Sequence, residues 1–393
     1  MTSAAPRSSV LALNSGSSSL KFGLYRIASS TPQMILSGEA ESIGERQGRF
    51  WAKDGNGKPL VSESTTFGTQ QDALARIGSF LGDRNDTRPA AVGHRVVHGG
   101  PNLHRHCLID DPVLRQIEAA AAFAPLHNPP ALSIIRFAQE HFPQLPQVAC
   151  FDTAFHARMP DIARTLPIPR DLRSCGIQRY GFHGLSCESI MRQLGDNRPD
   201  RLVIAHLGNG VSVTAVKDGK SVDTSMGLTP TGGAIMGTRC GDLDPGVLVY
   251  LLREKNFDAA RLEALVDHHS GLLGISGIDG DMRRLREASP TNADARLAIQ
   301  MFCYSVRKHV AGMIAALDGA ALLVFTGGIG EHDAGVRADI CDDLSWLGVS
   351  LDPERNQSSE GCISDARSRC AVRVLSSEED AQIAVHTAAL ARC

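Results

Sequence analysis

The sequence predicts an α/β protein built from two related halves. Apolar runs of strand length alternate with helical patterns along the 393 residues, and several of these runs end in glycines. One layout occurs twice, starting at Val10 and at Arg201: an apolar strand, a turn rich in Asn, Gly or Ser, and a second strand. At roughly 100–200 residues per domain, the length fits two or three domains. The expected architecture is therefore a duplicated α/β fold.

The N-terminal half is predicted to alternate strands and helices. Apolar runs predict strands at 10–13 and 20–27. Both Asp111-Pro112 and Asn128-Pro129 are expected to start helices, because Asp and Asn cap helices and proline suits the first turn. The remaining expected elements are short strands and hairpins over 38–65, a helix over 67–82, a strand running into glycines over 90–100, helices over 111–124 and 127–142, and a strand over 147–151.

The C-terminal half repeats the strand–turn–strand layout and adds a long helix. Segment 201–225 predicts two strands around an Asn/Gly turn, with Asp218-Gly219 as a further hairpin turn. The strand expected at 322–326 ends in glycines. A helix is expected over 293–317, with one apolar stripe formed by Ile299, Phe302, Val306, Val310, Met313 and Leu317.

The composition indicates a soluble, cytoplasmic protein. Hydrophobic residues make up 42% of the chain, and its net charge of -3 comes from interspersed acidic and basic residues, which argues against disorder and against a nucleic-acid partner. We expect neither a signal peptide nor a membrane span, since the opening residues and the rest of the chain lack apolar runs of the required length. The ten cysteines contain no C-x-x-C pair, so we expect reduced thiols.

The usual phosphate-binding loop is absent from the sequence. Segment 214–221 ends in Gly219-Lys220-Ser221, but Thr214 stands where a Walker A motif requires its first glycine. No G-x-G-x-x-G follows a predicted strand either. Glycine turns at strand ends can still direct backbone N–H groups at phosphate oxygens. A phosphate-binding protein with this sequence must therefore use another architecture.

Ten motifs, in order, resemble those of the acetate kinases, the acetokinase family. They are NSGSSSLKF, GHRVVHGG, PLHNPP, FDTAFH, RYGFHGLS, HLGNGVSV, DTSMGLTP, MGTRCGDLDPG, FTGGIGEH and SSEED, and the resemblance runs from Leu13 to about Ala384. It implies the two-lobed actin-like ATPase fold of duplicated ribonuclease-H-like domains, with the active site in the interlobe cleft. The implied lobes are 1–150 plus 377–393, on the metal and acyl-substrate side, and 151–376, for nucleotide binding and dimerisation.

The resemblance implies reversible, direct in-line phosphoryl transfer from ATP to acetate, giving acetyl phosphate and ADP. It also implies Mg²⁺ (or Mn²⁺) with the nucleotide and a homodimer. Propionate or another short acyl substrate is the alternative, although GHRVVHGG favours acetate or propionate over butyrate. A non-enzymatic interaction protein of the ATPase fold is the third hypothesis. The presence of the full set of polar motif residues argues against it.

The resemblance assigns Asn14 and Glu379 to the metal and places Lys21 near the ATP phosphates. Amide and carboxylate oxygens are the hard ligands that Mg²⁺ prefers. The neighbouring carboxylates Glu378 and Asp380 leave the position of the metal ligand open by one residue. A serine-rich turn that satisfies its own hydrogen bonds is the alternative interpretation of the segment after Asn14.

The implied catalytic residues are Arg95, His127, Asp152, His183 and Arg239. Phosphoryl transfer spreads charge over three oxygens, so positioned cations and donors suit it. The family assigns proton transfer to Asp152. Acetate, with a pKa near that of Asp at about 4, is already ionised at neutral pH, so we expect Asp152 to position the metal's water shell. A surface ion pair for either arginine and a core position for His183 are the alternatives.

Two further residue sets follow from the resemblance. The acyl pocket is expected to contain Arg95, Val97, Leu126, Phe182 and Pro230. The ATP-contacting set is expected to contain His206, Leu207, Gly208, Asn209, Gly210, Asp281, Met282, Arg283, Gly328, Ile329, Gly330, Glu331 and His332, together with Lys21. The sequence departs from the family pattern at Thr231-Gly232-Gly233, where many members have Leu-Glu-Gly, and at His332, where Asn is frequent.

Histidine pairs offer a competing metal hypothesis. His94 and His98, and likewise His104 and His106, have spacings that zinc sites use. No matching carboxylate or cysteine lies nearby in the sequence. A zinc site is therefore the minor alternative.

Overall fold

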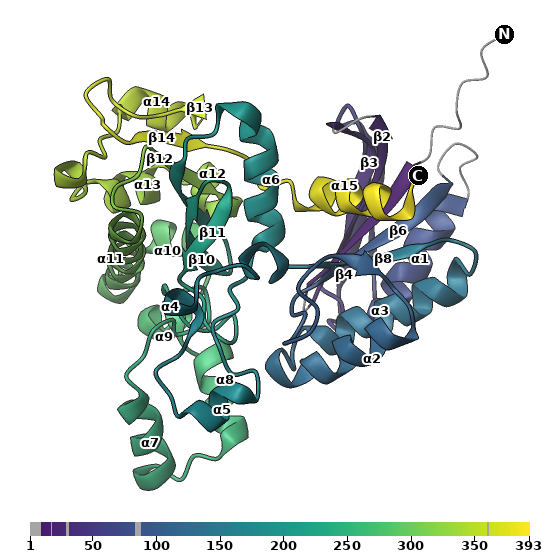
Figure 1. Ribbon diagram of the computed structural model, residues 1–393, viewed down its shortest axis with the longest axis horizontal. Coiled ribbons are helices and arrows are strands. Elements are labelled where there is room, and N and C mark those ends of the chain that lie inside the picture. Colours follow the sequence, from purple (N-terminus) through teal and green to yellow (C-terminus); the bar gives the residue numbers. More distant parts are fainter. Residues whose placement is uncertain (1–8, 17, 29–30, 83–87, 360) are drawn as a thin grey trace. The chain divides into compact units, whose positions relative to one another are not determined.

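The computed structural model describes residues 9–16, 18–28, 31–82, 88–359 and 361–393 (Figure 1). The opening residues 1–8, and Ser17 of the serine-rich turn, lie outside the described residues. The chain divides into two compact units, which we call unit 1 (1–157, 184–189 and 378–393) and unit 2 (158–183 and 190–377). Unit 1 thus extends beyond the expected boundary at residue 150 and includes the additional segment 184–189.

Unit 1 contains a mixed eight-stranded sheet in the order β5-β4-β3-β2-β1-β6-β8-β7. Strands β1 to β5 pair antiparallel in succession, β1, β6 and β8 run parallel, and β7 pairs antiparallel with β8. The strands are β1 (Ser9–Ser15), β2 (Leu20–Ala28), β3 (Thr31–Glu41), β4 (Gly48–Asp54), β5 (Pro59–Thr65), β6 (Pro89–Val96), β7 (Cys107–Leu108) and β8 (Gln147–Phe151).

Helices cover both faces of this sheet. They are α1 (Gln70–Gly82), α2 (Asp111–Ala119), α3 (Asn128–His141) and α15 (Glu379–Ala391). Side chains alternate along β1, so Leu11 and Leu13 join the core with α1 and α3, whereas Val10 and Ala12 join the core with α15. Figure 1 shows α15, in yellow, along the purple and blue strands. Because Asn14 is the next even-numbered position, it points to the α15 side.

Unit 2 repeats the arrangement of strands. Its sheet has the order β11-β10-β9-β12-β14-β13 and the same strand directions as β3-β2-β1-β6-β8-β7 of unit 1. The predicted duplication of an α/β unit is therefore confirmed by topology. The strands are β9 (Arg201–Leu207), β10 (Val211–Lys217), β11 (Lys220–Thr224), β12 (Leu322–Thr326), β13 (Gly361–Cys362) and β14 (Ala371–Val374).

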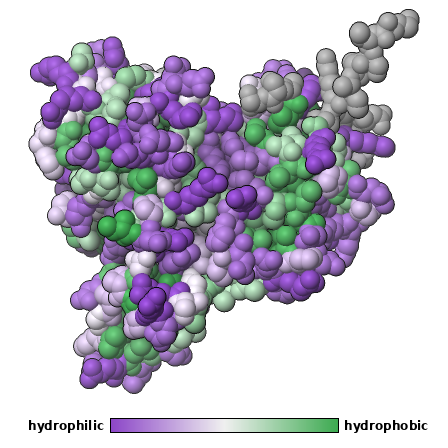
Figure 2. All heavy atoms as spheres, in the orientation of Figure 1, coloured by the Kyte–Doolittle hydropathy of each residue, from purple (hydrophilic) through white to green (hydrophobic). Residues whose placement is uncertain are grey.

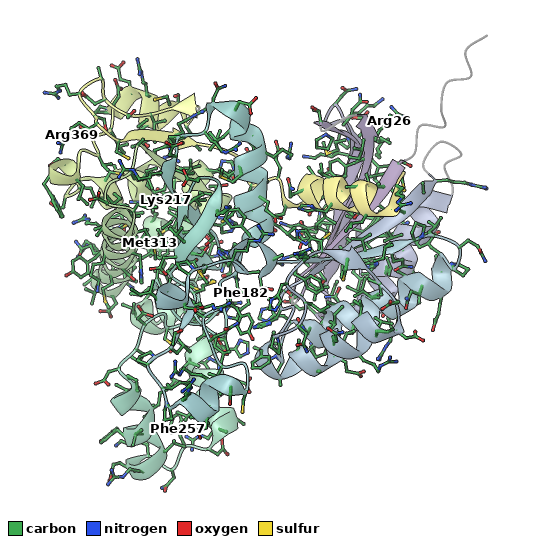
Figure 3. The ribbon with its side chains drawn as sticks, viewed as in Figure 1. Arg26, Phe182, Lys217, Phe257, Met313 and Arg369 are labelled. Atoms are coloured by element: carbon green, nitrogen blue, oxygen red, sulfur yellow. The ribbon has the colours of Figure 1, made fainter. Side chains whose placement is uncertain are left out.

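The helices of unit 2 include the predicted long helix, α11 (Ala293–Ala316), whose apolar stripe is buried, including Met313 (Figure 3). Helix α6 (Gly184–Leu194) starts in unit 1 and ends in unit 2. The others are α4 (Asp161–Arg164), α5 (Arg170–Ser174), α7 (Pro245–Glu254), α8 (Ala259–His268), α9 (Gly271–Ser276), α10 (Met282–Ala288), α12 (Gly327–His332), α13 (Ala334–Cys341) and α14 (Pro353–Ser358).

Two predicted helices begin at the expected residues, Asp111 and Asn128, but the capping roles expected of these residues are wrong. Asp110, rather than Asp111, caps α2, because its side chain accepts the Val113 N–H at 2.8 Å. His127 occupies the N-cap position of α3, and the buried amide of Asn128 instead bonds both backbone groups of His98. A buried amide is more stable with such partners than at a solvent-facing cap.

Three remaining observations bear on the expected class of protein. Hydrophilic and hydrophobic residues are interspersed over the face shown in Figure 2. Among the helices in the described part of the chain, none has the length and apolar character needed to cross a membrane. No disulfide joins the ten cysteines, all of which lie in the described residues.

Candidate active site

Arg95 and Asp152 form a buried ion pair at one edge of the unit 1 sheet. Arg95 lies near the end of β6, and Asp152 directly follows the parallel neighbour β8. The Nε and Nη2 atoms of Arg95 both donate to Oδ2 of Asp152, at 2.9 and 2.6 Å. Parallel strands end at the same edge of a sheet, which is where α/β proteins place ligand groups.

The second carboxylate oxygen of Asp152, Oδ1, differs from most buried polar atoms in its hydrogen bonding. Oδ1 is buried and has no hydrogen-bond partner. Burial raises the pKa of Asp152 to about 6, and the attraction of Arg95 opposes this shift. Because buried polar atoms are nearly always satisfied, this oxygen is suited to a cation or to a water held by one.

Asn14 connects the ion pair to the start of α15. Its Nδ2 atom donates to Glu379 Oε2 at 3.2 Å and to Asp380 Oδ1 at 2.9 Å, and its Oδ1 lies 3.4 Å from Nη1 of Arg95. Lys21 is the register partner of Asn14 on β2. Burial raises the pKa of Asp380, while the hydrogen bond from Asn14 lowers it. Asp380 thus belongs to this cluster as much as Glu379 does.

These residues fit a hard divalent cation. Asn14, Asp152, Glu379 and Asp380 contribute only amide and carboxylate oxygens, and one of these oxygens is buried without a hydrogen bond. The four side chains come from β1, the end of β8 and α15. We call them, with Arg95, the carboxylate cluster.

The expected acyl-side residues of unit 1 lie beside this edge. Val97 is buried directly after β6, whereas Leu126 is partly exposed. The two hydrogen bonds between His98 and Asn128 fix the segment of Leu126 and His127 relative to Val97. Asn128 therefore positions His127, a role that the sequence did not indicate.

In unit 2, His183 is held in an unusual conformation. Its φ of 57° is left-handed, which costs energy for a residue other than glycine. Its Nδ1 atom lies 3.0 Å from the Ser212 hydroxyl, and its ring stacks on His206 with centroids 4.1 Å apart. These contacts fix the direction of the other ring nitrogen, Nε2.

His183 and Arg239 converge on Gly210, in the glycine turn after β9. His183 Nε2 and Arg239 Nη1 lie 3.1 and 3.5 Å from the position that a Cβ atom on residue 210 would occupy. Arg239 Nη1 also donates to the Pro230 carbonyl at 3.3 Å. Phe182, labelled in Figure 3, is buried next to His183. A side chain at residue 210 would therefore press on the His183 ring and meet Arg239 at ordinary contact distance.

A cavity of 1330 Å³ in unit 2 is lined by much of the expected ATP-contacting set. It is bordered by the β9–β10 turn, by the segment leading into α10, and by α12. The expected residues among its lining are Gly208, Asn209, Asp281, Met282, Arg283, Gly328, Ile329 and His332. Further lining residues that the sequence did not indicate include Thr238, Ile278, Gln357 and Ser359.

The other expected nucleotide residues of unit 2 are not among those that line the cavity: His206, Leu207, Gly210, Gly330 and Glu331. The Glu331 carboxylate accepts the N–H groups of Gly327 and Ser377, each at 2.9 Å. The carbonyl of Gly330 accepts from the fully buried Arg337 at 2.8 Å. Both residues therefore hold α12 in place.

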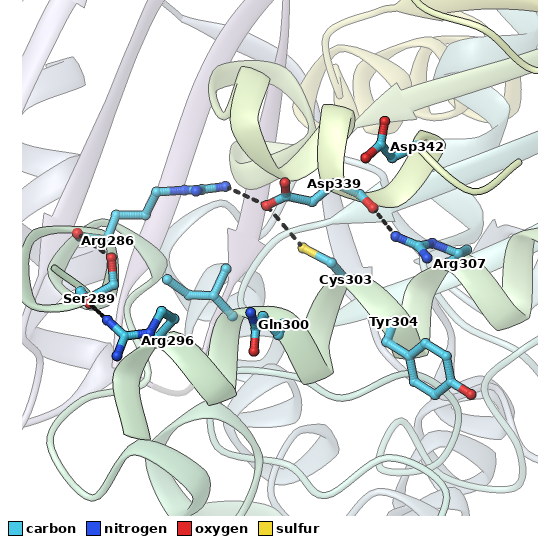
Figure 4. Close-up of a pocket in the computed structure, with 10 residues that line it drawn as sticks. Arg286, Ser289, Arg296, Gln300, Cys303, Tyr304, Arg307, Asp339 and Asp342 are labelled. Atoms are coloured by element: carbon cyan, nitrogen blue, oxygen red, sulfur yellow. Dashed lines mark hydrogen bonds and ion pairs between the residues drawn. The ribbon is translucent and has the colours of Figure 1, made fainter. Parts of the chain in front are cut away.

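A smaller cavity of 380 Å³ lies along α10, α11 and α13 (Figure 4). Arg286 lines both cavities and pairs with Asp333 at 3.0 Å and with Asp339 at 3.5 Å. Arg307 pairs with Asp343. The positive charges of these two arginines are thus compensated by neighbouring carboxylates.

Among the described residues, no group of three potential metal ligands contains both members of either histidine pair of the zinc alternative. His94 Nε2 bonds Gln147 at 2.8 Å, and His98 Nδ1 accepts the N–H of Gly100 at 2.8 Å. His106, however, meets Glu188 and His386, which are distant in sequence. This histidine–glutamate cluster was missed, because no local pattern links the three residues.

The model of the acetokinase family matches residues 9–385. The chain belongs to the acetokinase family. Acetate kinases of Dichelobacter nodosus and Nitrobacter hamburgensis are 43% and 41% identical to it, covering 97% of this chain and 98% and 96% of their own lengths. Among solved structures, a propionate kinase from Francisella tularensis (39% identical, TM-score 0.90) covers 98% of this chain and 100% of its own. The Porphyromonas gingivalis acetate kinase (34%, TM-score 0.86) covers 98% and 99%.

Membership of the acetokinase family confirms the resemblance drawn from the ten motifs, and the structural matches confirm the actin-like ATPase fold. Acetokinases are ATP-dependent kinases, which generally use a divalent metal.

Proposed function

We propose that this chain transfers a phosphoryl group from ATP to acetate directly and in line, giving acetyl phosphate and ADP, and that it catalyses the reverse reaction. The observation that carries the proposal is the extent of the match, since acetate kinases more than 40% identical align with 97% of the chain. Two features support it: unit 2 has a cavity of 1330 Å³ and the converging side chains of His183 and Arg239, and unit 1 has Arg95 paired with the buried Asp152 carboxylate.

In unit 2, Arg239 and His183 act on the transferring phosphoryl group. Its negative charge spreads over three oxygens, so fixed donors stabilise the transition state without having to reorganise. The Ser212 contact and the His206 stack hold His183 for this task. The 1330 Å³ cavity accepts the nucleotide.

In unit 1, Arg95 binds the acetate carboxylate through the N–H groups of its two η nitrogens that are not directed at Asp152 or Asn14. Asn14, Glu379 and Asp152 are the residues that hold Mg²⁺ (or Mn²⁺) and its water shell. The bound cation supplies positive charge to the phosphate oxygens. Lys21 and His127 serve as further hydrogen-bond donors in unit 1. Acetate needs no general base, so Asp152 serves as an orienting group.

Propionate is the second candidate substrate, because a propionate kinase is among the similar solved structures. Val97, Leu126, Phe182 and Pro230 form the acyl-contacting set in this proposal. Apolar contacts discriminate a single methylene by only about 1–3 kcal/mol. The test is ADP formation with acetate, propionate and butyrate in turn. We expect the highest kcat/KM with acetate; no carboxylate-dependent ADP formation would refute the proposed function.

We further infer a homodimer that uses α7 of unit 2. None of the residues of this apolar helix is buried, and Val249, Tyr250 and Leu252 are each about half exposed. Exposed apolar faces of this kind mark protein interfaces. A second copy of the chain is the partner that the proposal assigns. The expected cytoplasmic location stays a prediction.

A further inference from the structure

The histidine–glutamate cluster joins three elements of unit 1. His386 of α15 lies with Nε2 2.8 Å from Oε2 of Glu188, in the part of α6 that belongs to unit 1. His106, just before β7, lies with Nε2 3.2 and 3.3 Å from the two Glu188 oxygens. Burial alone would raise the pKa of Glu188, but the hydrogen bonds from both histidines lower it to about 2. Glu188 is thus a carboxylate contacted by two histidine rings, and Nε2 of His386 also lies 2.9 Å from the side-chain nitrogen of Gln382.

Two histidines and a glutamate are also a possible set of metal ligands. The backbone N–H of Phe151, however, donates to Nδ1 of His106 at 3.1 Å. Nδ1 therefore carries the lone pair, and Nε2 carries the proton that points at Glu188. A metal-bound histidine normally donates from its second nitrogen instead. The contacts favour a hydrogen-bonded network over a metal site.

Two members of this network, His106 and Glu188, are tied to the carboxylate cluster through the backbone, and the third, His386, shares α15 with Glu379. Phe151, which bonds His106, directly precedes Asp152. The N–H of Gly184, at the start of α6, donates to the Asp152 carbonyl at 2.9 Å. Ser189, next to Glu188, accepts the N–H of Glu378 through its hydroxyl at 3.3 Å, directly before Glu379. Contacts of the network therefore reach the backbone next to Asp152 and the backbone at the start of α15.

We propose that Glu188, gripped by His106 and His386, is a positioning residue that sets Asp152 and Glu379 at the spacing their shared cation requires. The proposal rests on the proposed function, since it assumes that this cluster holds the catalytic metal. In this proposal Glu188 acts through its neighbours and is not itself a ligand of the substrate or of the shared cation. Its loss should weaken metal binding in unit 1 and leave the nucleotide cavity of unit 2 intact.

Glu188→Gln tests this proposal, because it keeps the size of the side chain and removes its charge. The matched control is Glu118→Gln, which alters an exposed carboxylate of unit 1 paired with Arg136. Mn²⁺ binding in the presence of ADP is measured by electron paramagnetic resonance, and the Mg²⁺ dependence of kcat by steady-state assay. Outer partners of metal sites typically contribute about 10–100-fold. We expect a loss near tenfold in Mn²⁺ affinity with the KM for ATP nearly unchanged, and no effect in the control.

If Glu188→Gln does not fold, His386→Asn replaces it, since it removes one of the two histidine contacts of Glu188 and should give a smaller loss in the same direction. Unchanged Mn²⁺ affinity in a folded variant would overturn the proposal. So would a stoichiometric transition metal in the purified protein that Glu188→Gln lacks, because the cluster would then be a metal site. A wild-type protein without acetate-dependent ADP formation would refute the proposed function separately, since Mn²⁺ binding still decides the role of Glu188.

Discussion

Arg95 neutralises a buried carboxylate and, in our proposal, also binds the substrate. Arg95→Ala should therefore raise the KM for acetate and lower kcat, while the KM for ATP changes little. The variant should also be less stable, because removing one partner of a buried ion pair costs about 3–5 kcal/mol. Steady-state kinetics and a melting temperature measure both effects. Arg136→Ala is the control, since its ion pair with Glu118 is exposed; equal effects in the two variants would contradict the assignment.

His94 predicts a pH dependence of stability. Burial lowers its pKa to about 4, so it stays neutral in the fold, while the unfolded chain binds a proton below about pH 6.5. Neutral His94 makes its full contribution to the free energy of unfolding above pH 6.5. This contribution is lost as the pH falls towards 4, and the loss amounts to up to about 3 kcal/mol. The melting temperature of His94→Asn should fall less between pH 7 and pH 4 than that of the wild type. An equal fall of the melting temperature in the two proteins between pH 7 and pH 4 would contradict this account.

Among the elements, α15 depends on one glycine of the sheet. A Cβ atom on Gly93 of β6 would overlap the hydroxyl of Thr387 and lie 2.7 Å from Cγ2 of Ile383. Gly93→Ala should therefore displace α15 and destabilise the protein by about 1–3 kcal/mol, as overpacking does. Because α15 carries Glu379, the Mg²⁺ requirement should rise as well.

Calorimetry and the Mg²⁺ dependence of activity check this expectation. Gly82→Ala is the matched control, since a Cβ atom there meets no other atom within 4 Å. A Gly93→Ala protein as stable as the control would show that α15 tolerates the extra volume.

Most elements could be predicted because their signals are local. The apolar period of α11 and the Asp218-Gly219 turn follow from neighbouring residues, and both have the expected structure. The start of α3 at Asn128 was also predicted, but the role of the Asn128 side chain could not be, since it bonds His98, which is distant in sequence. The capping preference of a residue is overridden when a buried backbone group elsewhere in the fold needs its side chain as a hydrogen-bond partner.

At the scale of the whole molecule, the motifs predicted the family and eight of the 19 residues that line the 1330 Å³ cavity of unit 2. They did not reveal Asp380 as an equal partner of Asn14, nor the contacts of Glu188 with His106 and His386, at separations of 82 and 198 residues. Such contacts arise only when distant segments meet in the fold. A single sequence carries no signal for them.

The proposed dimer predicts the behaviour of the assembly. Tyr250→Asp on α7 should shift sedimentation from dimer to monomer, because a charge cannot be buried in an apolar interface without a partner. Trp346→Asp is the control, since this side chain is even more exposed and lies away from α7 in the sequence. A wild-type monomer at micromolar concentration, or a Tyr250→Asp dimer of unchanged stability, would contradict the assignment.

The central claim is that fixed cations stabilise phosphoryl transfer to acetate, and Arg239 tests it most directly. The measurement is the kcat of acetate-dependent ADP formation for the wild type, Arg239→Ala and Arg239→Lys. Loss of one such donor costs about 10²–10³ in rate, so Arg239→Ala should lose that much with little change in either KM. Arg239→Lys should recover little, because an ammonium group lacks the forked geometry. A kcat of Arg239→Ala equal to that of the wild type would contradict the account.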